Sequence, residues 1–447
     1  MKLAGTFMTG GYLHSAYFWL SVVGMGASDA VLNAAMKSRA LARSVQRHGD
    51  AHIGQNSAAV KWAVVEALVR FSRLATATAE RLKLRNPLAL HKGAQELVRL
   101  QRRYRWHREG VESRVRLDGA RLFVLDRLMQ FSAAAYGWKT LKFLGLGRAG
   151  MRSNRSGIQL LTGVDARDIR LVQDTSRTFR PGYFVCVDHV TRNVVVTIRG
   201  TMRLQDVVTD LSCEETSLML YDEANDEHLH GTAHGGFLQA AHNVKAEVQD
   251  TVESAMREFP AYGLQVTGHS LGGACATLLA LIWSQEAVFA SREVRAVSFA
   301  APCCLSHSLA RSKYAKKHIS SLVLGDDFVC RLSLVSVEGF FRTCDELVQL
   351  AKNHMLCEDS GRKTLERIRA EGQARRDRLF PGGRVFHIPL QSRYEPARHD
   401  VYMAEEVDPA LSLSEIVLTP KMFNVHLPTR YLNALPNGDS CSDFKKA

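Results

Sequence analysis

The nine-residue stretch "VTGHSLGGA" constrains the fold of this chain more than any other. It has the form G-x-S-x-G, with Gly268 and Gly272 two residues to either side of Ser270. Glycine is needed at both places when a serine stands on a sharp turn between a strand and a helix, because the two backbones nearly touch there. Residues 264–267 predict a short buried strand, and residues 271–289, rich in Ala and Leu and free of Pro, predict a helix. The pattern therefore favours a nucleophile elbow over a Gly-rich turn with an incidental serine.

Strand-like and helical segments alternate after residue 182. The strand-like segments are "YFVCVDH", "NVVVTIRG", "LQVTG", "VRAVSFAAP", "SSLVLGDD" and "RVFHIPL". Such alternation predicts an α/β protein with a mostly parallel sheet and helices on both of its faces. The nine cysteines include no C-x-x-C pair and no finger-like spacing with histidine, so neither a disulfide framework nor a zinc site is indicated.

A serine hydroxyl becomes a good nucleophile when an imidazole takes its proton and a carboxylate orients that imidazole. On an elbow of this kind the acid and then the histidine follow the serine along the chain, each after a strand. The strand ending at Leu324 is followed by Asp326 and Asp327, and spacing alone does not separate the two. His399 and His426 are the later candidates for the base. His426 is favoured because it lies between the strand-like "EIVLTP" and the helix-like end of "HLPTRYLNAL".

The formal net charge of +13 is unevenly distributed. Residues 37–118 hold 18 Lys/Arg and 7 Asp/Glu, whereas residues 119–447 sum to +2. Hydrophobic side chains recur at helical spacing in residues 55–108, which predicts helices. The basic run Arg99–Glu109, "RLQRRYRWHRE", suits an anionic membrane, a nucleic acid or a solvated face. No nucleic-acid motif accompanies it, so we expect no nucleic-acid partner.

The first residues form an uncharged run. No charged residue occurs from Leu3 to Ser28, and a membrane span needs about 20 mostly apolar residues. The run is long enough but weakly apolar, with several glycines and His14. A membrane-embedded helix and a packed or interfacial helix are both open for this segment.

Six stretches carry a resemblance to a known family. They are "SAAAYGW", "RPGYFVCVDHVTRNVVVTIRGTMRLQDVVTDLS", "AHGGFLQAAHNV", "VTGHSLGGACATLLAL", "DFVCRLS" and "MFNVHLPTRYLNAL", which together span roughly residues 120–440. In them the chain resembles the class 3 (fungal-type) lipases of the α/β-hydrolase fold, and most of all the sn-1-specific diacylglycerol lipases. The resemblance implies a lipase domain over residues 119–447, preceded by the apolar segment 1–36 and the basic helical region 37–118.

The resemblance also assigns roles to the candidate residues. The acid of the family precedes a hydrophobic-Val-x-Arg-Leu pattern, which selects Asp327, although Cys330 stands where proline is usual. Its histidine precedes a Leu-Pro pair, which selects His426. The resemblance thus implies that Ser270 attacks, that His426 acts as base and then acid, and that Asp327 orients His426.

Three further residues and one insertion follow from the same resemblance. It implies an oxyanion hole made by Thr201, through its N–H and hydroxyl, and by the N–H of Leu271. Asp210 matches an acceptor that holds the threonine side chain, with a helix-surface charge as the alternative. The charged insertion 344–382 resembles in place a regulatory loop over the active site, with a solvated helical excursion as the alternative.

The expected function is that of a membrane-associated serine lipase that hydrolyses a glycerolipid ester, with diacylglycerol as the leading substrate. We expect it on anionic membrane surfaces with its catalytic domain on the cytoplasmic side. A phospholipase A1, a triacylglycerol lipase and an idle lipid-binding or scaffold protein are the alternatives. The chemistry needs no cofactor or metal, and no calcium loop of the EF-hand type is present in the sequence.

Overall fold

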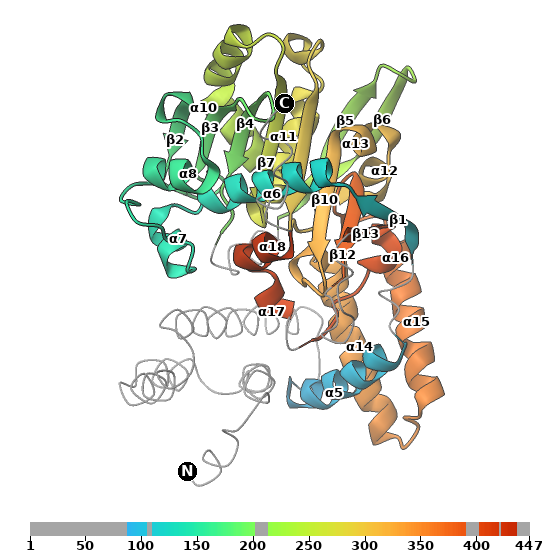
Figure 1. Cartoon of the computed structure of the whole chain (residues 1–447). Coiled ribbons are helices and arrows are strands. Elements are labelled where there is room, and N and C mark those ends of the chain that lie inside the picture. Colours follow the sequence, from blue (N-terminus) through green and yellow to red (C-terminus); the bar gives the residue numbers. More distant parts are fainter. Residues whose placement is uncertain (1–86, 105–109, 202–212, 390–401, 420–421, 436–447) are drawn as a thin grey trace.

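The computed structural model describes residues 87–104, 110–201, 213–389, 402–419 and 422–435. These residues are organised around a nine-stranded sheet with helices on both faces (Figure 1). The strand order is β1-β13-β12-β10-β8-β7-β4-β3-β2.

The middle of the large sheet is parallel and its edges are antiparallel. The parallel strands are β4 (Asn193–Ile198), β7 (Gly263–His269), β8 (Val294–Phe299), β10 (Ile319–Leu324) and β12 (Arg384–Ile388). The outer strands are β2 (Ile169–Gln173), β3 (Tyr183–Asp188), β13 (Tyr402–Val407) and β1 (Val111–Leu117). This topology confirms the predicted α/β architecture. It also brings the residues that follow β7 and β10 to one edge of the sheet, because parallel strands end at the same edge.

Both faces of the sheet are buried, which explains why the central strands are continuously apolar. Along β3, Val185 packs in a cluster with α10 (Gly235–Glu258) and α11 (Leu271–Trp283), whereas Phe184 and Cys186 pack in a second cluster. The second cluster is formed with α6 (Gly119–Ala134), α8 (Asn154–Thr162) and α18 (Pro428–Ala434).

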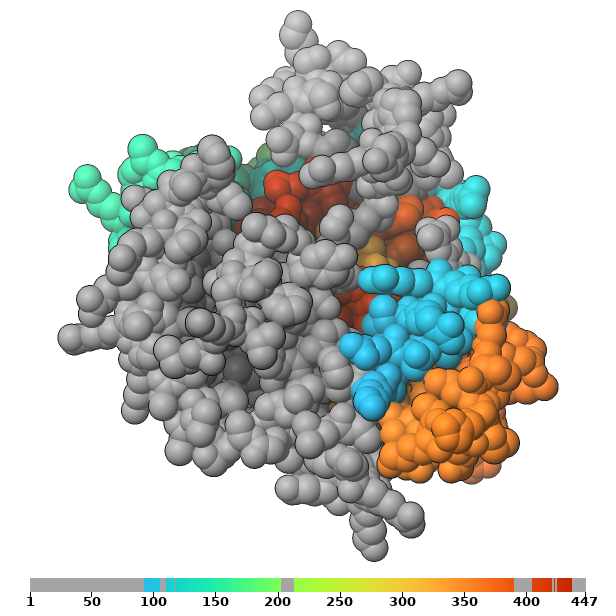
Figure 2. Space-filling view, turned by 90° about the horizontal axis from the view of Figure 1, so that it is seen from below, coloured from blue at the N-terminus to red at the C-terminus, as the bar shows by residue number. Residues whose placement is uncertain are grey.

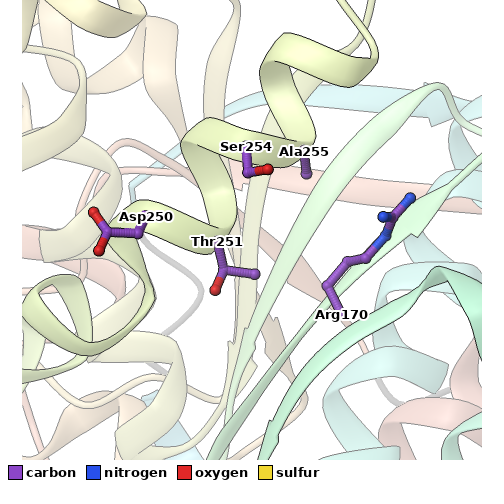
Figure 3. A pocket seen from close by; sticks show the side chains of 5 residues that line it. All are labelled: Arg170, Asp250, Thr251, Ser254 and Ala255. Carbon is purple, nitrogen blue, oxygen red and sulfur yellow. The ribbon is translucent and has the colours of Figure 1, made fainter.

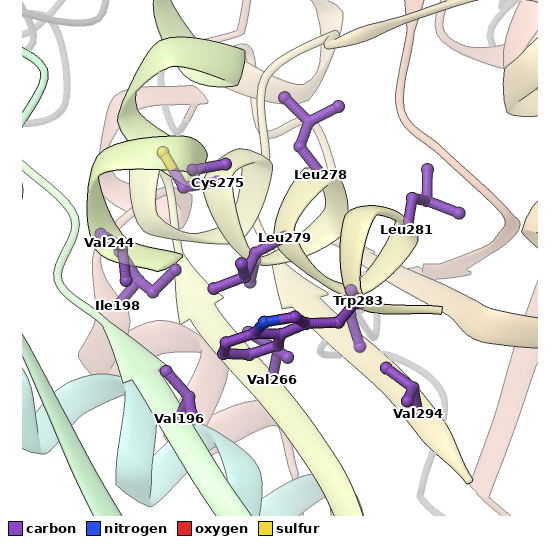
Figure 4. Close-up of a cluster of buried hydrophobic side chains, with 14 of the residues drawn as sticks. Val196, Ile198, Val244, Val266, Cys275, Leu278, Leu279, Leu281, Trp283 and Val294 are labelled. Carbon is purple, nitrogen blue, oxygen red and sulfur yellow. The ribbon is translucent and has the colours of Figure 1, made fainter. Parts of the chain in front are cut away.

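Figure 4 shows part of the first cluster. Trp283, at the end of α11, lies in this cluster with Val196, Val266 and Val294 of three neighbouring strands. Its Nε1 donates a hydrogen bond to Gln249 of α10 at 2.7 Å, so the one polar atom of the ring is satisfied within the core. The helix that begins at the elbow is therefore held at its far end as well.

A smaller sheet lies beside the large one. Its order is β11-β9-β6-β5, with bounds β5 (Glu215–Asp222), β6 (Glu227–His234), β9 (Leu305–Ser306) and β11 (Leu379–Phe380). The remaining short elements are α7 (Trp138–Phe143), α12 (His307–Ala310), α13 (Lys313–His318), α16 (Pro409–Ser412), α17 (Met422–Val425), η3 (Ala166–Asp168), η4 (Ala287–Phe289) and η5 (Val329–Arg331).

Three helices form a third apolar cluster. They are α5 (Pro87–Tyr104), α14 (Leu334–Lys352) and α15 (Glu358–Ala374). Cys344 and Leu347 of α14 are fully buried, as Leu365 of α15 nearly is. The insertion 344–382 therefore contributes to the core, which argues against its reading as a solvated excursion.

The structure differs from three local expectations. The helix expected over residues 271–289 ends at Trp283 and is followed by a turn and η4. The strand expected in "EIVLTP" is wrong, because its described residues form a buried irregular segment. Strand β1 lies within the region 37–118 expected to be helical, and it pairs with β13 in the large sheet.

Among the described residues, no helix combines the length and the apolar character of a membrane span. The run Leu3–Ser28 and the expected helices before residue 87 lie outside the described residues.

Candidate active site

Ser270 stands between β7 and α11 in a strained backbone conformation. Its φ is 59° and its ψ is −131°, a combination that residues with a side chain rarely adopt. Its side chain forms no cap hydrogen bond with α11, so the hydroxyl is not used to finish the helix. The predicted elbow is present, and it leaves Oγ available for another partner.

The glycines around Ser270 are required by contact between backbones. A Cβ on Gly268 would lie 2.4 Å from the carbonyl of Gly272, and a Cβ on Gly272 would lie 2.2 Å from the carbonyl oxygen of Ile198. Neither contact can be relieved by moving a flexible side chain. The G-x-S-x-G form therefore follows from the close approach of β4, β7 and α11.

A chain of hydrogen bonds joins Ser270 to a histidine and an aspartate. Ser270 Oγ lies 3.0 Å from Nε2 of His426, and Nδ1 of His426 lies 3.0 and 3.1 Å from the two carboxylate oxygens of Asp327. All three side chains are buried, with exposed fractions of 0% for Ser270 and Asp327 and 7% for His426. Asp327 follows β10, and His426 occupies the turn between α17 and α18.

Asp327 accepts further hydrogen bonds. The backbone N–H of Val329 donates to Oδ1 at 2.9 Å, and Tyr431 Oη donates to Oδ2 at 2.8 Å. The N–H of Leu324 in turn donates to Tyr431 Oη at 3.0 Å. Burial raises the pKa of Tyr431 well above its ordinary value, so the phenol keeps the proton that it donates. These contacts stabilise a buried carboxylate that would otherwise be costly.

The end of α16 and the irregular segment 413–418, which lead towards His426, are held by side chains from distant parts of the chain. Gln101 of α5 donates from Nε2 to the carbonyl of Ile416 at 2.8 Å and accepts from the N–H of Leu418 at 3.1 Å. Arg331, 1% exposed, donates to the carbonyl of Ser412 at 2.7 Å. Arg378, within the insertion, donates to the carbonyl of Ser414. Side chains thus replace the sheet partner that this backbone lacks.

His269 lies directly behind the nucleophile. Its Nδ1 is 2.8 Å from Tyr136 Oη, and its ring packs on that of His426 with centroids 4.9 Å apart. Burial, and secondarily the charge of His426, hold the pKa of His269 well below its ordinary value. The ring is therefore neutral and acts as packing between Tyr136 and His426 in this arrangement.

Thr201 lies near the elbow, as its neighbour Gly200 shows. A Cβ on Gly200 would lie 2.3 Å from the carbonyl oxygen of His269 and 2.2 Å from Tyr136 Oη. Thr201 follows directly, and Leu271 is the first residue of α11. Asp210 lies outside the described residues.

The other candidates fare differently. Asp326 is part-exposed, and within the described structure it makes no hydrogen bond to His426. His399 lies outside the described residues. Two adjacent cysteines after β8, Cys303 and Cys304, are also buried. Burial raises the pKa of both thiols, to about 12 for Cys303, so both stay protonated.

Surface pockets occur away from the hydrogen-bonded chain. One of about 340 Å³ is lined by Arg170 of β2 and by Asp250, Thr251, Ser254 and Ala255 of α10 (Figure 3). None of these residues contacts Ser270 or His426 in the hydrogen-bond network. In the described part of the chain, no three His, Cys, Asp or Glu residues cluster in a way that could hold a metal ion.

A parallel sheet whose elbow serine is hydrogen-bonded to a histidine and an aspartate from later loops defines an α/β-hydrolase of the serine type. The family model for "Lipase (class 3)" matches residues 195–337, a stretch that includes Thr201, Ser270 and Asp327 and ends before His426. Over these residues the chain is similar to the class 3 lipases.

Curated proteins and solved structures are similar to parts of this chain. Diacylglycerol lipase-beta of Mus musculus is 35% identical over 261 residues, which cover 53% of this chain and 37% of the relative. Diacylglycerol lipase-alpha of Homo sapiens is 25% identical over 300 residues, covering 59% of this chain and 28% of the relative. This chain thus spans about a third of the length of these relatives. A lipase structure from Rhizopus microsporus var. chinensis covers 69% of this chain and 90% of its own, at 18% identity and a TM-score of 0.42.

Sequence reasoning missed the supporting residues. Tyr136 and Tyr431 lie in the stretches "SAAAYGW" and "HLPTRYLNAL" that carried the resemblance, but no role was assigned to them. Gln101 and Arg378 gave no signal, because only the fold brings them to the segment that precedes His426.

Proposed function

We propose that this chain is a serine lipase that hydrolyses an acyl ester of a glycerolipid, with the sn-1 ester of diacylglycerol as its leading substrate. The observation that supports this most is the continuous hydrogen-bonded chain from Ser270 Oγ through His426 to Asp327. The similarity to two diacylglycerol lipases supports the choice of substrate.

The geometry suits acyl transfer in two steps. His426 takes the proton of Ser270 as Oγ attacks the ester carbonyl, and Asp327 stabilises the imidazolium that forms. His426 then gives the proton to the departing alcohol, which leaves an acyl group on Ser270. Water, activated by His426, releases the fatty acid and restores the serine.

The negative oxygen of the tetrahedral intermediate requires donors. We assign this role to the N–H and hydroxyl of Thr201 and to the N–H of Leu271. Leu271 N–H lies at the positive end of the α11 dipole, where negative charge is favoured. Each such donor typically lowers the barrier by about 3 kcal/mol.

The substrate must reach a buried nucleophile. Ser270 is 0% exposed, so part of the protein has to move before an acyl chain contacts Oγ. Lipid substrates reside in membranes, and we therefore place the enzyme at a membrane surface. We also place the domain on the cytoplasmic side, since the spacing of the nine cysteines in the sequence indicates no disulfide framework.

A lipid panel tests the substrate. Purified full chain would be offered 1,2-diacylglycerol labelled separately at sn-1 and sn-2, phosphatidylcholine and triacylglycerol in mixed micelles. We expect release of the sn-1 label from diacylglycerol at the highest kcat/KM. Preferential hydrolysis of phosphatidylcholine or triacylglycerol would show that this lipid, and not diacylglycerol, is the preferred substrate. Absence of turnover on every lipid would contradict the proposed activity.

A further inference from the structure

The helix α7 and the loop after it carry an unusual concentration of positive charge. From Arg127 to Val164 the sequence has six Lys/Arg and no Asp/Glu, although residues 119–447 as a whole sum to only +2. Five of the six lie within residues 138–155, and all five are exposed. They are Lys139, Lys142, Arg148, Arg152 and Arg155.

This charge is not neutralised within the described structure. No carboxylate of the described residues forms an ion pair with any of the five. The arginines of α15 behave differently, because Arg362 pairs with Asp359 and Glu366, and Arg367 pairs with Glu346 and Glu371. The insertion is rich in charges that cancel one another, whereas those of α7 face solvent uncompensated.

Aromatic side chains accompany the basic ones. Phe143, the last residue of α7, is 38% exposed. The Nζ atoms of Lys142 and Lys139 lie 4.8 and 5.7 Å from the ring centroid of the part-exposed Trp138. An exposed phenylalanine, a half-buried tryptophan and lysines on flexible stems are the side chains that settle at the interface between lipid headgroups and acyl chains.

The position of α7 relates it to the active site. It begins two residues after Tyr136, whose Oη contacts His269, the neighbour of Ser270. It projects at the same end of the molecule as α17 and α18, between which His426 lies (Figure 1). Seen from that end, the green residues of this region lie at the rim of the face on which part of the red C-terminal region is visible (Figure 2).

We propose that the α7 surface, defined as Lys139, Lys142, Phe143, Arg148 and Arg152, docks on an anionic phospholipid bilayer. Four basic side chains meet the negative headgroups, and Phe143 enters the interface beside them. Docking places the end of the sheet that bears Ser270 next to the bilayer. The inference rests on the proposed function, because docking on a bilayer serves an enzyme whose substrate is a lipid. The binding to the bilayer itself does not depend on hydrolysis.

The test compares two double substitutions on matched six-residue helices. Lys139→Gln with Lys142→Gln alters α7. Lys313→Gln with Lys317→Gln alters α13, and these two of its three lysines are also exposed. Both are made in full chain carrying Ser270→Ala, so that hydrolysis does not remodel the vesicles. Partitioning onto vesicles of 70% phosphatidylcholine and 30% phosphatidylserine is then measured by sedimentation, with circular dichroism and thermal unfolding as checks of the fold.

Each neutralised lysine at an anionic surface weakens partitioning about fivefold, so we expect about a 25-fold loss for the α7 pair and little change for the α13 pair. If other segments hold every variant on the vesicles, quenching of Trp138 by brominated phosphatidylserine reports docking, taken as the difference from Trp138→Phe. The α7 pair should reduce that quenching. Unchanged partitioning and unchanged quenching in the α7 pair, or equal binding of the parent protein to pure phosphatidylcholine, would overturn the proposal. The lipid panel is run on the chain that keeps Ser270, so the two results are independent. Vesicle binding through α7 without turnover of any lipid would contradict the activity alone, and turnover without binding through α7 would contradict the docking alone.

Discussion

Tyr431 Oη donates a hydrogen bond to Oδ2 of Asp327 at 2.8 Å, across 104 residues of sequence. The same phenol accepts from the N–H of Leu324, so it links the end of β10 to the carboxylate that contacts His426. The buried carboxylate is thus fixed from α18 as well as from its own loop.

Tyr431→Phe removes this donor while keeping the ring in place. Hydrogen bonds to charged groups contribute about 1.5–3 kcal/mol, so we expect kcat to fall roughly 10- to 100-fold with little change in KM. Steady-state kinetics on a soluble ester measure this. A variant with unchanged kcat would mean that Tyr431 is only a packing residue.

Substituting each of the two neighbouring aspartates in turn tests which of them orients His426. Asp327→Asn should leave His426 in the wrong tautomer and reduce kcat by about 10⁴-fold. Asp326→Asn is the matched control, since its side chain is part-exposed and does not contact His426 in the described network, and we expect less than a tenfold change. The opposite ranking of the two variants would show that the acid has been assigned to the wrong position.

Gln101 couples α5 to the segment before His426. Gln101→Ala leaves the carbonyl of Ile416 and the N–H of Leu418 buried without a partner, which should lower the free energy of unfolding by about 2–4 kcal/mol. Arg102→Ala alters the adjacent exposed position and should stay within about 0.5 kcal/mol of the parent protein. The free energy of unfolding of both variants is measured by denaturant titration. Equal values for the two variants would contradict the role of Gln101 in holding the segment before His426.

Buried His269 predicts a pH dependence of stability. Its pKa in the folded protein is below that of the unfolded chain, mainly because of burial, so the unfolded state binds more protons as the pH falls. The contribution of the neutral ring to stability is therefore complete above about pH 6.5 and is lost progressively as the pH falls below that value. Thermal unfolding of His269→Gln should show a smaller decrease from pH 7.5 to 5 than the parent protein.

A second histidine serves as the control for this effect. His318 is part-buried and its pKa is also lowered, chiefly by burial, so His318→Gln should flatten the profile in the same direction but less. An unchanged slope in His269→Gln would show that the ring is not held neutral.

The elbow was predictable because its requirement is local and steric. Gly268 and Gly272 are needed by the backbone around Ser270, and any chain that makes this turn must have them. Spacing in the sequence reduced the candidates for the acid and the base to a few residues but did not decide among them. His426 and Asp327 are 99 residues apart in the sequence, and only the fold brings them together. Before the structure, only the resemblance to the class 3 lipases selected Asp327 and His426 from the other candidates.

The strand expected in "EIVLTP" failed for a physical reason that sequence cannot show. Its residues are as apolar as those of a buried strand, but their backbone groups are paired with the side chain of Gln101, 315 residues away from Ile416. A prediction from periodicity assumes a neighbouring strand as the partner. Here side chains of α5, η5 and the insertion, and not a neighbouring strand, form the hydrogen bonds to this backbone.

The central claim is that Ser270 is the nucleophile of a lipase, and labelling with a fluorophosphonate probe tests it most directly. Full chain, Ser270→Ala and the exposed control Ser217→Ala would be labelled side by side and assayed for ester turnover after their thermal unfolding has been compared. We expect Ser270→Ala to fold normally, to lose all labelling and to lose turnover by about 10⁴-fold or more, while Ser217→Ala matches the parent protein. Labelling or more than a few per cent of turnover retained by pure Ser270→Ala would contradict the proposed function.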